Sequence, residues 1–231
     1  MKRWLPMEPD LSVLFPYDNF NGSWRLIPQK RFAQEFPASW KYLNENRERL
    51  ESRESGRMKG ASDWYGFIYP KNLEVMNLSK ILVPAIATKA EYCLDSQGKY
   101  YYVGSGGGGG GGHAIIPKIK IDMHYLCGLL NSKCLDTFLQ KVTTPFHSGW
   151  FAYSKAYIAQ IPIKLPETAD EKKLADRIIE SVHAIMGAKT KLCDAKLSDR
   201  ERRILEGDVE NQERRIDELV FRLYGVKGLP S

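Results

Sequence analysis

The sequence has few cysteines and no long apolar run. Its four cysteines form no Cys-x-x-Cys pair, so we expect free thiols in a cytoplasmic protein rather than a disulfide scaffold. No stretch approaches the roughly 20 apolar residues of a membrane span. Residues 1–6 lack the apolar core of a signal peptide. Secreted, membrane-spanning and disordered classes are therefore not expected. The remaining composition, 43% hydrophobic and 27% charged, is typical of a globular protein.

Charge and aromatic residues divide the 231 residues into two parts. Residues 164–231 contain 14 basic and 14 acidic residues, so residues 1–163 carry the whole net charge of +6. Phe221 and Tyr224 are the only Phe, Trp or Tyr residues of the second part. We predict a basic, aromatic-rich body over residues 1–163 and a helical tail over residues 164–231.

The hydrophobic pattern predicts an α+β fold, with a twisted, mainly antiparallel sheet and flanking helices. One predicted helix begins near Pro37 and ends near residue 55, and another begins at Asp122 and runs through Phe138. Turns are predicted at residues 18–22 and 95–98. The predicted strands are residues 11–15, 24–27, 81–86, 91–94, 100–103 and 114–116.

The tail is predicted to form an antiparallel pair of helices joined near residues 194–198. Apolar residues from Leu174 to Ile185 form a stripe at helical spacing, weakened at Gly187. A heptad seam then runs from Leu205 to Leu223, and Gly225 is a plausible stop. Neither helix buries its stripe alone, so each must pack on the other, on the body or on a partner.

Residues 104–112 contain eight glycines in nine positions. A nucleotide or S-adenosylmethionine site would need these glycines to open a helix, whereas residues 113–117 have the pattern of a strand. Two interpretations remain equally open. The tract is either a flexible hairpin loop or a loop whose backbone amides approach DNA phosphates closely.

Lysines dominate the charge after residue 95. Between residues 96 and 163 there are six lysines against Asp122 and Asp136. Lysines interleaved with Tyr and Trp are typical of a nucleic-acid surface, because they provide charge for phosphates and planar groups for bases. An ordinary solvated face is the alternative interpretation.

Catalytic and metal-binding patterns are weak. His124, Cys127 and Cys134 share one predicted helix, but no fourth ligand has a suitable spacing. Nothing in the sequence orients His113 or His147 toward a nucleophile. We therefore predict no catalytic residue and no metal ligand in this chain.

Several short segments together resemble the TaqI-like C-terminal specificity domain of adenine-specific DNA methyltransferases and type IIG restriction-modification enzymes. They occur in the family's order and cover nearly the whole chain. The segments are residues 15–18 (FPYD), 38–43 (ASWKYL), 64–65 (WY), 80–84 (KILVP), 100–102 (YYY), 129–133 (LLNSK), 161–163 (IPI) and 216–225 (IDELVFRLYG).

The resemblance implies a DNA sequence-recognition domain that binds duplex DNA and aims methyl transfer to adenine N6. It implies a separate methyltransferase domain or subunit, with or without a nuclease, as the partner. S-adenosylmethionine is expected in that catalytic domain, because the "N-P-P-[YF]" motif is not present here in usable form. Base-reading residues are not carried over, since the loops of such domains diverge. The glycine tract is also longer than the family pattern.

The proposed DNA contacts combine charge with groups near the glycine tract. Lysines, together with Arg25, are expected to contact phosphates, and Ser105 and Gly106 to offer loop amides. Groove or sugar contacts are expected from His113, Ser148, Trp150 and Tyr153. The lysines are Lys89, Lys118, Lys120, Lys141 and Lys155.

Two alternatives from other classes stay open. One is a protein-interaction module whose basic face is incidental and whose tail oligomerises. The other is a stand-alone enzyme that uses the glycine tract for a nucleotide.

Overall fold

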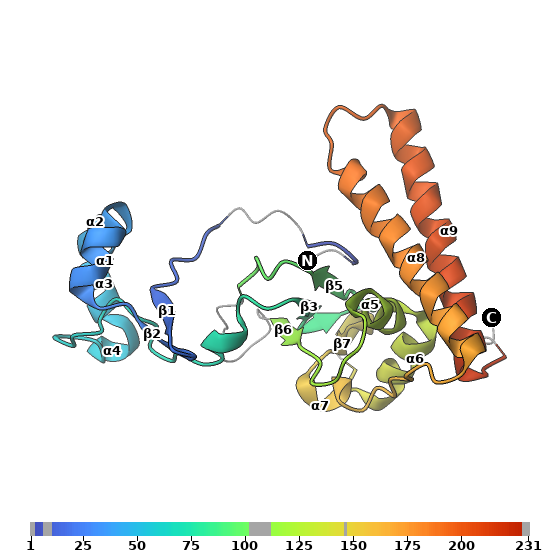
Figure 1. Cartoon of the computed structure of the whole chain (residues 1–231), viewed down its shortest axis with the longest axis horizontal. Helices are drawn as coiled ribbons and strands as arrows, with labels where there is room; N and C mark the ends of the chain where they lie inside the picture. Colours follow the sequence, from blue (N-terminus) through green and yellow to red (C-terminus); the bar gives the residue numbers. More distant parts are fainter. Residues whose placement is uncertain (1–2, 7–10, 102–111, 146, 228–231) are drawn as a thin grey trace. The chain divides into compact units, whose positions relative to one another are not determined.

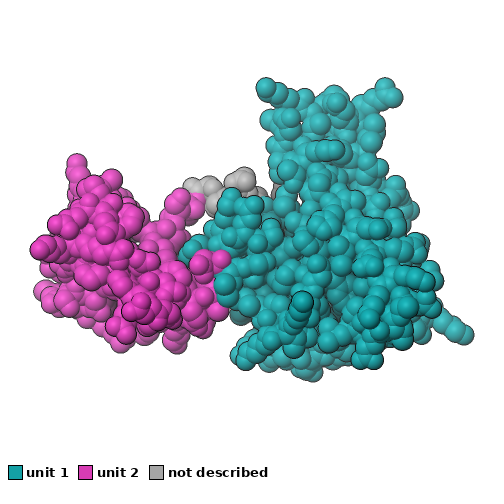
Figure 2. Space-filling view, in the orientation of Figure 1, with its two compact units in different colours: residues 1–8, 78–231 teal, residues 9–77 magenta. Residues whose placement is uncertain are grey.

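The structure is a computed structural model that describes residues 3–6, 11–101, 112–145 and 147–227. The chain divides into two compact units, coloured separately in Figure 2. The smaller unit is residues 9–77, and the larger unit combines residues 1–8 with residues 78–231. Each unit has a hydrophobic cluster of its own.

The smaller unit opens with a hairpin of β1 (Tyr17–Phe20) and β2 (Ser23–Leu26). Phe20 pairs with Ser23, so the loop is the two-residue turn Asn21-Gly22, with φ of 52° and 84°. The second strand lies close to its expected place, but the expected first strand over residues 11–15 is wrong. A two-residue turn requires the partner strand to end at residue 20, immediately before it.

Four helices follow in the smaller unit: α1 (Gln29–Glu35), α2 (Pro37–Glu45), α3 (Arg47–Glu51) and α4 (Arg53–Gly56). The expected start at Pro37 is confirmed, whereas the single helix to residue 55 is broken and α1 was not expected. Glu54 and Ser55 have positive φ, which ends regular helix there. A short 3-10 helix, η1 (Leu73–Val75), precedes the larger unit.

The sheets of the larger unit are small and antiparallel. Strand β3 (Lys80–Pro84) lies between β5 (Cys93–Asp95) and β6 (Gly112–Ile115). Strand β4 (Ile86–Ala87) pairs with β7 (Phe151–Ala152). In the segment expected as a strand over 100–103, Tyr100 and Tyr101 are not in a strand, and the rest lies outside the described residues.

The helix expected from Asp122 to Phe138 consists of two helices, α5 (Met123–Asn131) and α6 (Lys133–Val142). Asp122 caps α5 as expected, accepting hydrogen bonds from the backbone N–H groups of His124 and Tyr125 at 2.8 and 3.0 Å. The break falls at Ser132, whose extended backbone lets its hydroxyl cap α6. A short 3-10 helix, η2 (His147–Gly149), precedes β7, and α7 (Lys155–Ile158) follows it.

The tail forms the predicted helical pair, α8 (Ala169–Leu192) and α9 (Asp199–Tyr224), which run antiparallel in Figure 1. Both begin with a capping box, at Thr168 and Ser198, and Gly225 ends α9 with a φ of 67°. Gly187 does not interrupt α8. With the small antiparallel sheets, the pair confirms the expected α+β class.

The helical pair shares one core with the sheet and α5. Gly128 on α5 lies so close to α8 that an added Cβ would be 2.5 Å from Cγ2 of Ile178. One cluster of buried residues includes Ile81 of β3, Leu129 of α5 and Leu219 of α9. The chain divides into its two compact units between residues 77 and 78, and the predicted division at residues 163 and 164 into a recognition domain and a tail stays a prediction.

Candidate nucleic-acid interface

Seven lysines between residues 78 and 163 are exposed, and six of them have no carboxylate oxygen within 4.0 Å in the described parts of the chain. The six are Lys89, Lys99, Lys118, Lys120, Lys141 and Lys155, whereas the seventh, Lys133, lies 3.8 Å from Asp217. Lys80 differs, because it forms a buried ion pair with Asp95 at 2.8 Å. Asp95 is thus neutralised internally, which leaves Glu91, Asp122 and Asp136 as the other acidic residues of this region. Because seven exposed lysines outnumber these three carboxylates, the outer charge of the region is positive.

The carboxylate of Asp136 on α6 accepts hydrogen bonds within this positive region. Its Oδ1 accepts a hydrogen bond from the hydroxyl of Tyr153 at 2.8 Å, and its Oδ2 accepts one from Nε2 of Gln140 at 3.1 Å. The backbone of nearby Ala90 also lowers the pKa of this carboxyl group. Burial raises the pKa of Asp136, and the hydrogen bonds oppose that shift. This half-buried carboxylate therefore joins α6 to the end of β7 and lies close to the segment before β5.

Three lysines that are far apart in the sequence lie within a few residues of these contacts. Lys89 precedes Ala90, Lys155 follows Tyr153 by two residues, and Lys141 lies on α6 beyond Asp136. Consecutive Cα atoms are only about 3.8 Å apart, so each lysine is anchored close to the same network. We call Lys89, Lys141 and Lys155 the lysine cluster.

A second set of bonds anchors Trp150 beside the cluster. The hydroxyl of Thr143 donates to the carbonyl oxygen of Ala152 at 2.6 Å, and Pro145 forms an antiparallel bridge with Phe151. Lys141 and Trp150 each lie two residues from the Thr143–Ala152 bond. The indole of Trp150 is 42% exposed. An exposed planar ring therefore accompanies exposed cations, as nucleic-acid binding requires.

The remaining predicted contacts lie outside this arrangement. Lys118 and Lys120 are exposed between β6 and α5, and no hydrogen bond among the described residues joins that segment to the lysine cluster. His113 is exposed on β6, opposite Val83. Arg25 is exposed on β2 of the smaller unit.

Residues around η2 and in the glycine tract complete the predicted set. Ser148 is exposed in a turn where it and Gly149 have φ of 62° and 74°. Ser105 and Gly106, with the tract to residue 111, lie outside the described residues.

Tyr153 is buried, with 0% of its surface exposed, so its ring does not face a ligand in this structure. Its hydroxyl is bound to Asp136, and burial together with that carboxylate raises the pKa of Tyr153. Asp136 was not predicted as a site residue. The sequence contained one indication of its role, because Asp136 is an acidic residue between Leu135 and Leu139, which are both buried on α6.

Two segments that carry the family resemblance form structural contacts away from the lysine cluster. The side-chain amide of Asn131 forms two hydrogen bonds with the backbone of Tyr92. The amide oxygen accepts from the Tyr92 N–H at 3.1 Å, and the amide nitrogen donates to the Tyr92 carbonyl oxygen at 2.9 Å. The backbone N–H of Lys133 donates to Asp217 of α9 at 2.7 Å. Residues 129–133 and 216–225 therefore stabilise the break between α5 and α6 and the docking of α9.

Other kinds of site are not formed by the described residues. No group of three or more His, Cys, Asp or Glu side chains among them is arranged to hold a metal ion. Cys127 is buried, which raises the pKa of its thiol to about 12, and His124 instead packs against His183 with ring centroids 4.0 Å apart. Among the helices of the described part, none has the length and apolarity needed to cross a membrane.

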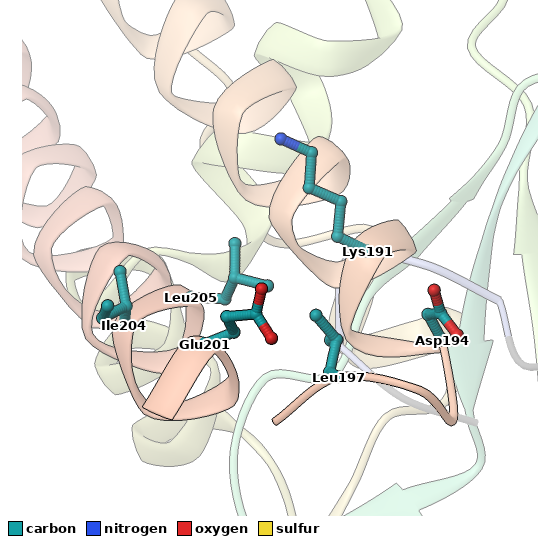
Figure 3. Close-up of a pocket in the computed structure, with 6 residues that line it drawn as sticks. All are labelled: Lys191, Asp194, Leu197, Glu201, Ile204 and Leu205. Carbon is teal, nitrogen blue, oxygen red and sulfur yellow. The ribbon is translucent and has the colours of Figure 1, made fainter. Parts of the chain in front are cut away.

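A groove lies at the far end of the helical pair, where α8 turns into α9. Its volume is about 350 Å³, and Ile204 on its wall is 55% exposed. Figure 3 shows apolar and charged side chains along it. They are Lys191, Asp194, Leu197, Glu201, Ile204 and Leu205.

Comparison with known proteins relates the chain to restriction-modification enzymes. No protein-family model matches it. It is similar to the type II restriction enzyme and methyltransferase RM.Eco57I of Escherichia coli, with 20% identity over 236 residues. The match covers 97% of this chain and 23% of that relative, so the chain spans less than a quarter of the relative's length. The similarity supports a restriction-modification association for the chain.

Proposed function

We propose that the chain is the DNA sequence-recognition part of a restriction-modification adenine-N6 methyltransferase. In this role it binds duplex DNA and positions a separate catalytic domain. The observation that carries the proposal is the lysine cluster, whose members are exposed and lack carboxylate partners among the described residues, beside the exposed ring of Trp150. The similarity to a restriction enzyme and methyltransferase supports the same system.

In the proposed mechanism, one set of residues binds the DNA phosphates and another set recognises the bases. Lys89, Lys141 and Lys155 contact phosphates, and Lys118 and Lys120 extend that contact along the duplex. Each phosphate contact releases condensed counterions, so binding weakens steeply as salt rises. Phosphate contacts fix the register of the protein on the duplex without reading its sequence.

Base and sugar contacts come from the side chains around the cluster. We assign them to Trp150 and Ser148, with His113 on the edge strand β6. An exposed indole has a planar face for a sugar or an unstacked base, and a hydroxyl bonds either donors or acceptors in the groove.

The methyl transfer itself belongs to the partner. In this proposal a separate methyltransferase domain binds S-adenosylmethionine, and the chain only aims the reaction. The outer end of the helical pair docks that domain or a second copy of the chain. The exposed side chain of Ile204 and the groove beside it support a docking role.

The test is binding of a randomised duplex pool, followed by fluorescence anisotropy across a salt series and by sequencing of the DNA that stays bound at the highest salt. We expect a steep salt slope and an enriched motif. A steep salt slope without an enriched DNA motif would mean that the chain binds phosphates without recognising a sequence. No binding at about 50 mM salt, where phosphate contacts are strong, would contradict the proposal and favour a protein-interaction module.

A further inference from the structure

The buried Tyr153 and the half-buried Asp136 form a contact that the proposed DNA contacts do not use directly. Tyr153 lies between β7 and α7, and its backbone N–H donates to the carbonyl of Ala85 beyond β3 at 2.9 Å. Its hydroxyl reaches Asp136 on α6 at 2.8 Å. The ring of Tyr153 also packs against Tyr92, so Tyr153 contacts residues 85 and 92 on either side of Lys89. Tyr153 thus links two loop segments to one helix.

We propose that Asp136 and Tyr153 are positioning residues that hold Lys89 and Lys155 in the register needed to contact successive DNA phosphates. The inference rests on the proposed DNA-binding function and deepens it. It assigns to Tyr153 an indirect role in place of the direct contact that the sequence suggested. Lys141 needs no such link, because it is carried by α6 itself.

The burial of Tyr153 explains why this contact determines the position of the segments. A hydroxyl withdrawn from water needs a hydrogen-bond partner, and the half-buried carboxylate of Asp136 is the partner of the Tyr153 hydroxyl. If the Tyr153 hydroxyl is removed, its bond to Asp136 is lost, while the ring still fills its place and the Thr143–Ala152 bond remains. The start of α7 is then held less tightly against α6, so the position of Lys155 varies more.

A neighbouring tyrosine provides a matched control. The ring of Tyr92 packs edge-on against Tyr153, with centroids 5.9 Å apart and an interplanar angle of 72°. Its hydroxyl is also buried, but it has no hydrogen-bond partner among the described residues. Tyr92→Phe therefore removes the same atom from the same part of the core without breaking a bond. Any effect specific to Tyr153→Phe then reports the bond to Asp136.

The experiment measures the salt dependence of duplex binding for Tyr153→Phe, Tyr92→Phe, Lys155→Ala and the double variant of Tyr153 and Lys155. We expect Tyr153→Phe to make the slope of log K against log salt shallower by about 1 to 2, the value for one or two phosphate contacts, and Tyr92→Phe to leave it unchanged. In the double variant, the effect of Lys155→Ala should be smaller than in the wild-type protein. Additive effects of the two substitutions, or equal slopes for the two tyrosine variants, would overturn the inference.

Hydrogen exchange provides a readout that needs no DNA. In Tyr153→Phe, peptides that contain Ala90 and residues 152–158 should exchange faster than in Tyr92→Phe, because both segments lose their shared anchor. If the wild-type protein does not bind DNA, the proposed function fails and the inference with it. If the wild-type protein binds and Tyr153→Phe keeps the full slope, only the inference fails.

Discussion

Replacing Gly128 by alanine tests how the helical pair docks on α5. A Cβ at this position would lie 2.5 Å from Cγ2 of Ile178 and 3.1 Å from Cγ2 of Val182. Both of these α8 side chains are fully buried, at 0% exposure. β-Branched side chains have one strongly preferred rotamer in a helix, so they do not rotate away. The two helices must separate to admit the methyl group.

The expected magnitude follows from two opposing effects. Overpacking of a filled core destabilises a protein by about 1–3 kcal/mol. Replacing a helical glycine by alanine alone stabilises it by about 1 kcal/mol. Gly187 on α8 and Gly207 on α9 isolate the second effect, because a Cβ at either position meets nothing within 4 Å. Gly128→Ala should therefore be about 1–3 kcal/mol less stable than Gly187→Ala.

The assay is urea or thermal denaturation of the three alanine variants in parallel. For a unit of this size, 1 kcal/mol corresponds to about 2–4 °C in Tm, so the difference from Gly187→Ala should be about 2–12 °C. Equal stability of Gly128→Ala and Gly187→Ala would refute the close packing of α5 on α8. It would then favour a tail that folds separately from the body.

Two further predictions concern ion pairs. Hydrogen bonds from Lys164 and from backbone N–H groups lower the pKa of Glu171 to about 2. The carboxylate therefore stabilises the folded state at pH values above its unfolded pKa of about 4.3. This stabilisation is lost as the pH falls toward 2. Glu171→Gln retains the capping box, and its urea midpoint should fall less between pH 5 and pH 3 than that of the wild type; an equal fall would contradict the assignment. Lys80→Met leaves the buried Asp95 unpaired and should lower the free energy of unfolding by about 3–5 kcal/mol, whereas Lys133→Met at an exposed pair should change it by less than about 1 kcal/mol. Similar losses for the two lysine variants in urea denaturation would show that the Lys80 pair is not buried in solution.

Features set by local chemistry could be predicted from the sequence. The cap at Asp122, the helix start at Pro37 and the stop at Gly225 each depend on residues within one turn. The heptad seam likewise indicates a helical pair, because its stripes need a partner. These features define the class of the fold.

Features set by distant contacts could not be predicted. The break at Ser132 is stabilised by Asp217, which accepts from the backbone of Lys133 although it is 84 residues away in the sequence. The same limit applies to the candidate site. Tyr153 looks like a surface aromatic among lysines, and only its contacts with Asp136 and Tyr92 show that it is buried.

The central claim is tested most directly by comparing two triple variants of equal charge. One changes the lysine cluster to alanine. The other changes three exposed lysines of the helical pair, Lys172, Lys191 and Lys196. Each loses three positive charges, so a difference between them reports location and not net charge.

Duplex binding is measured for both triple variants and the wild type from about 50 to 300 mM salt. At about 0.9 in slope for each phosphate contact, the cluster variant should have a slope shallower by about 2.7, while the control should keep most of the wild-type slope. Equal slopes for the two variants would contradict the account, because the lysine cluster would then contribute only to the general charge of the chain.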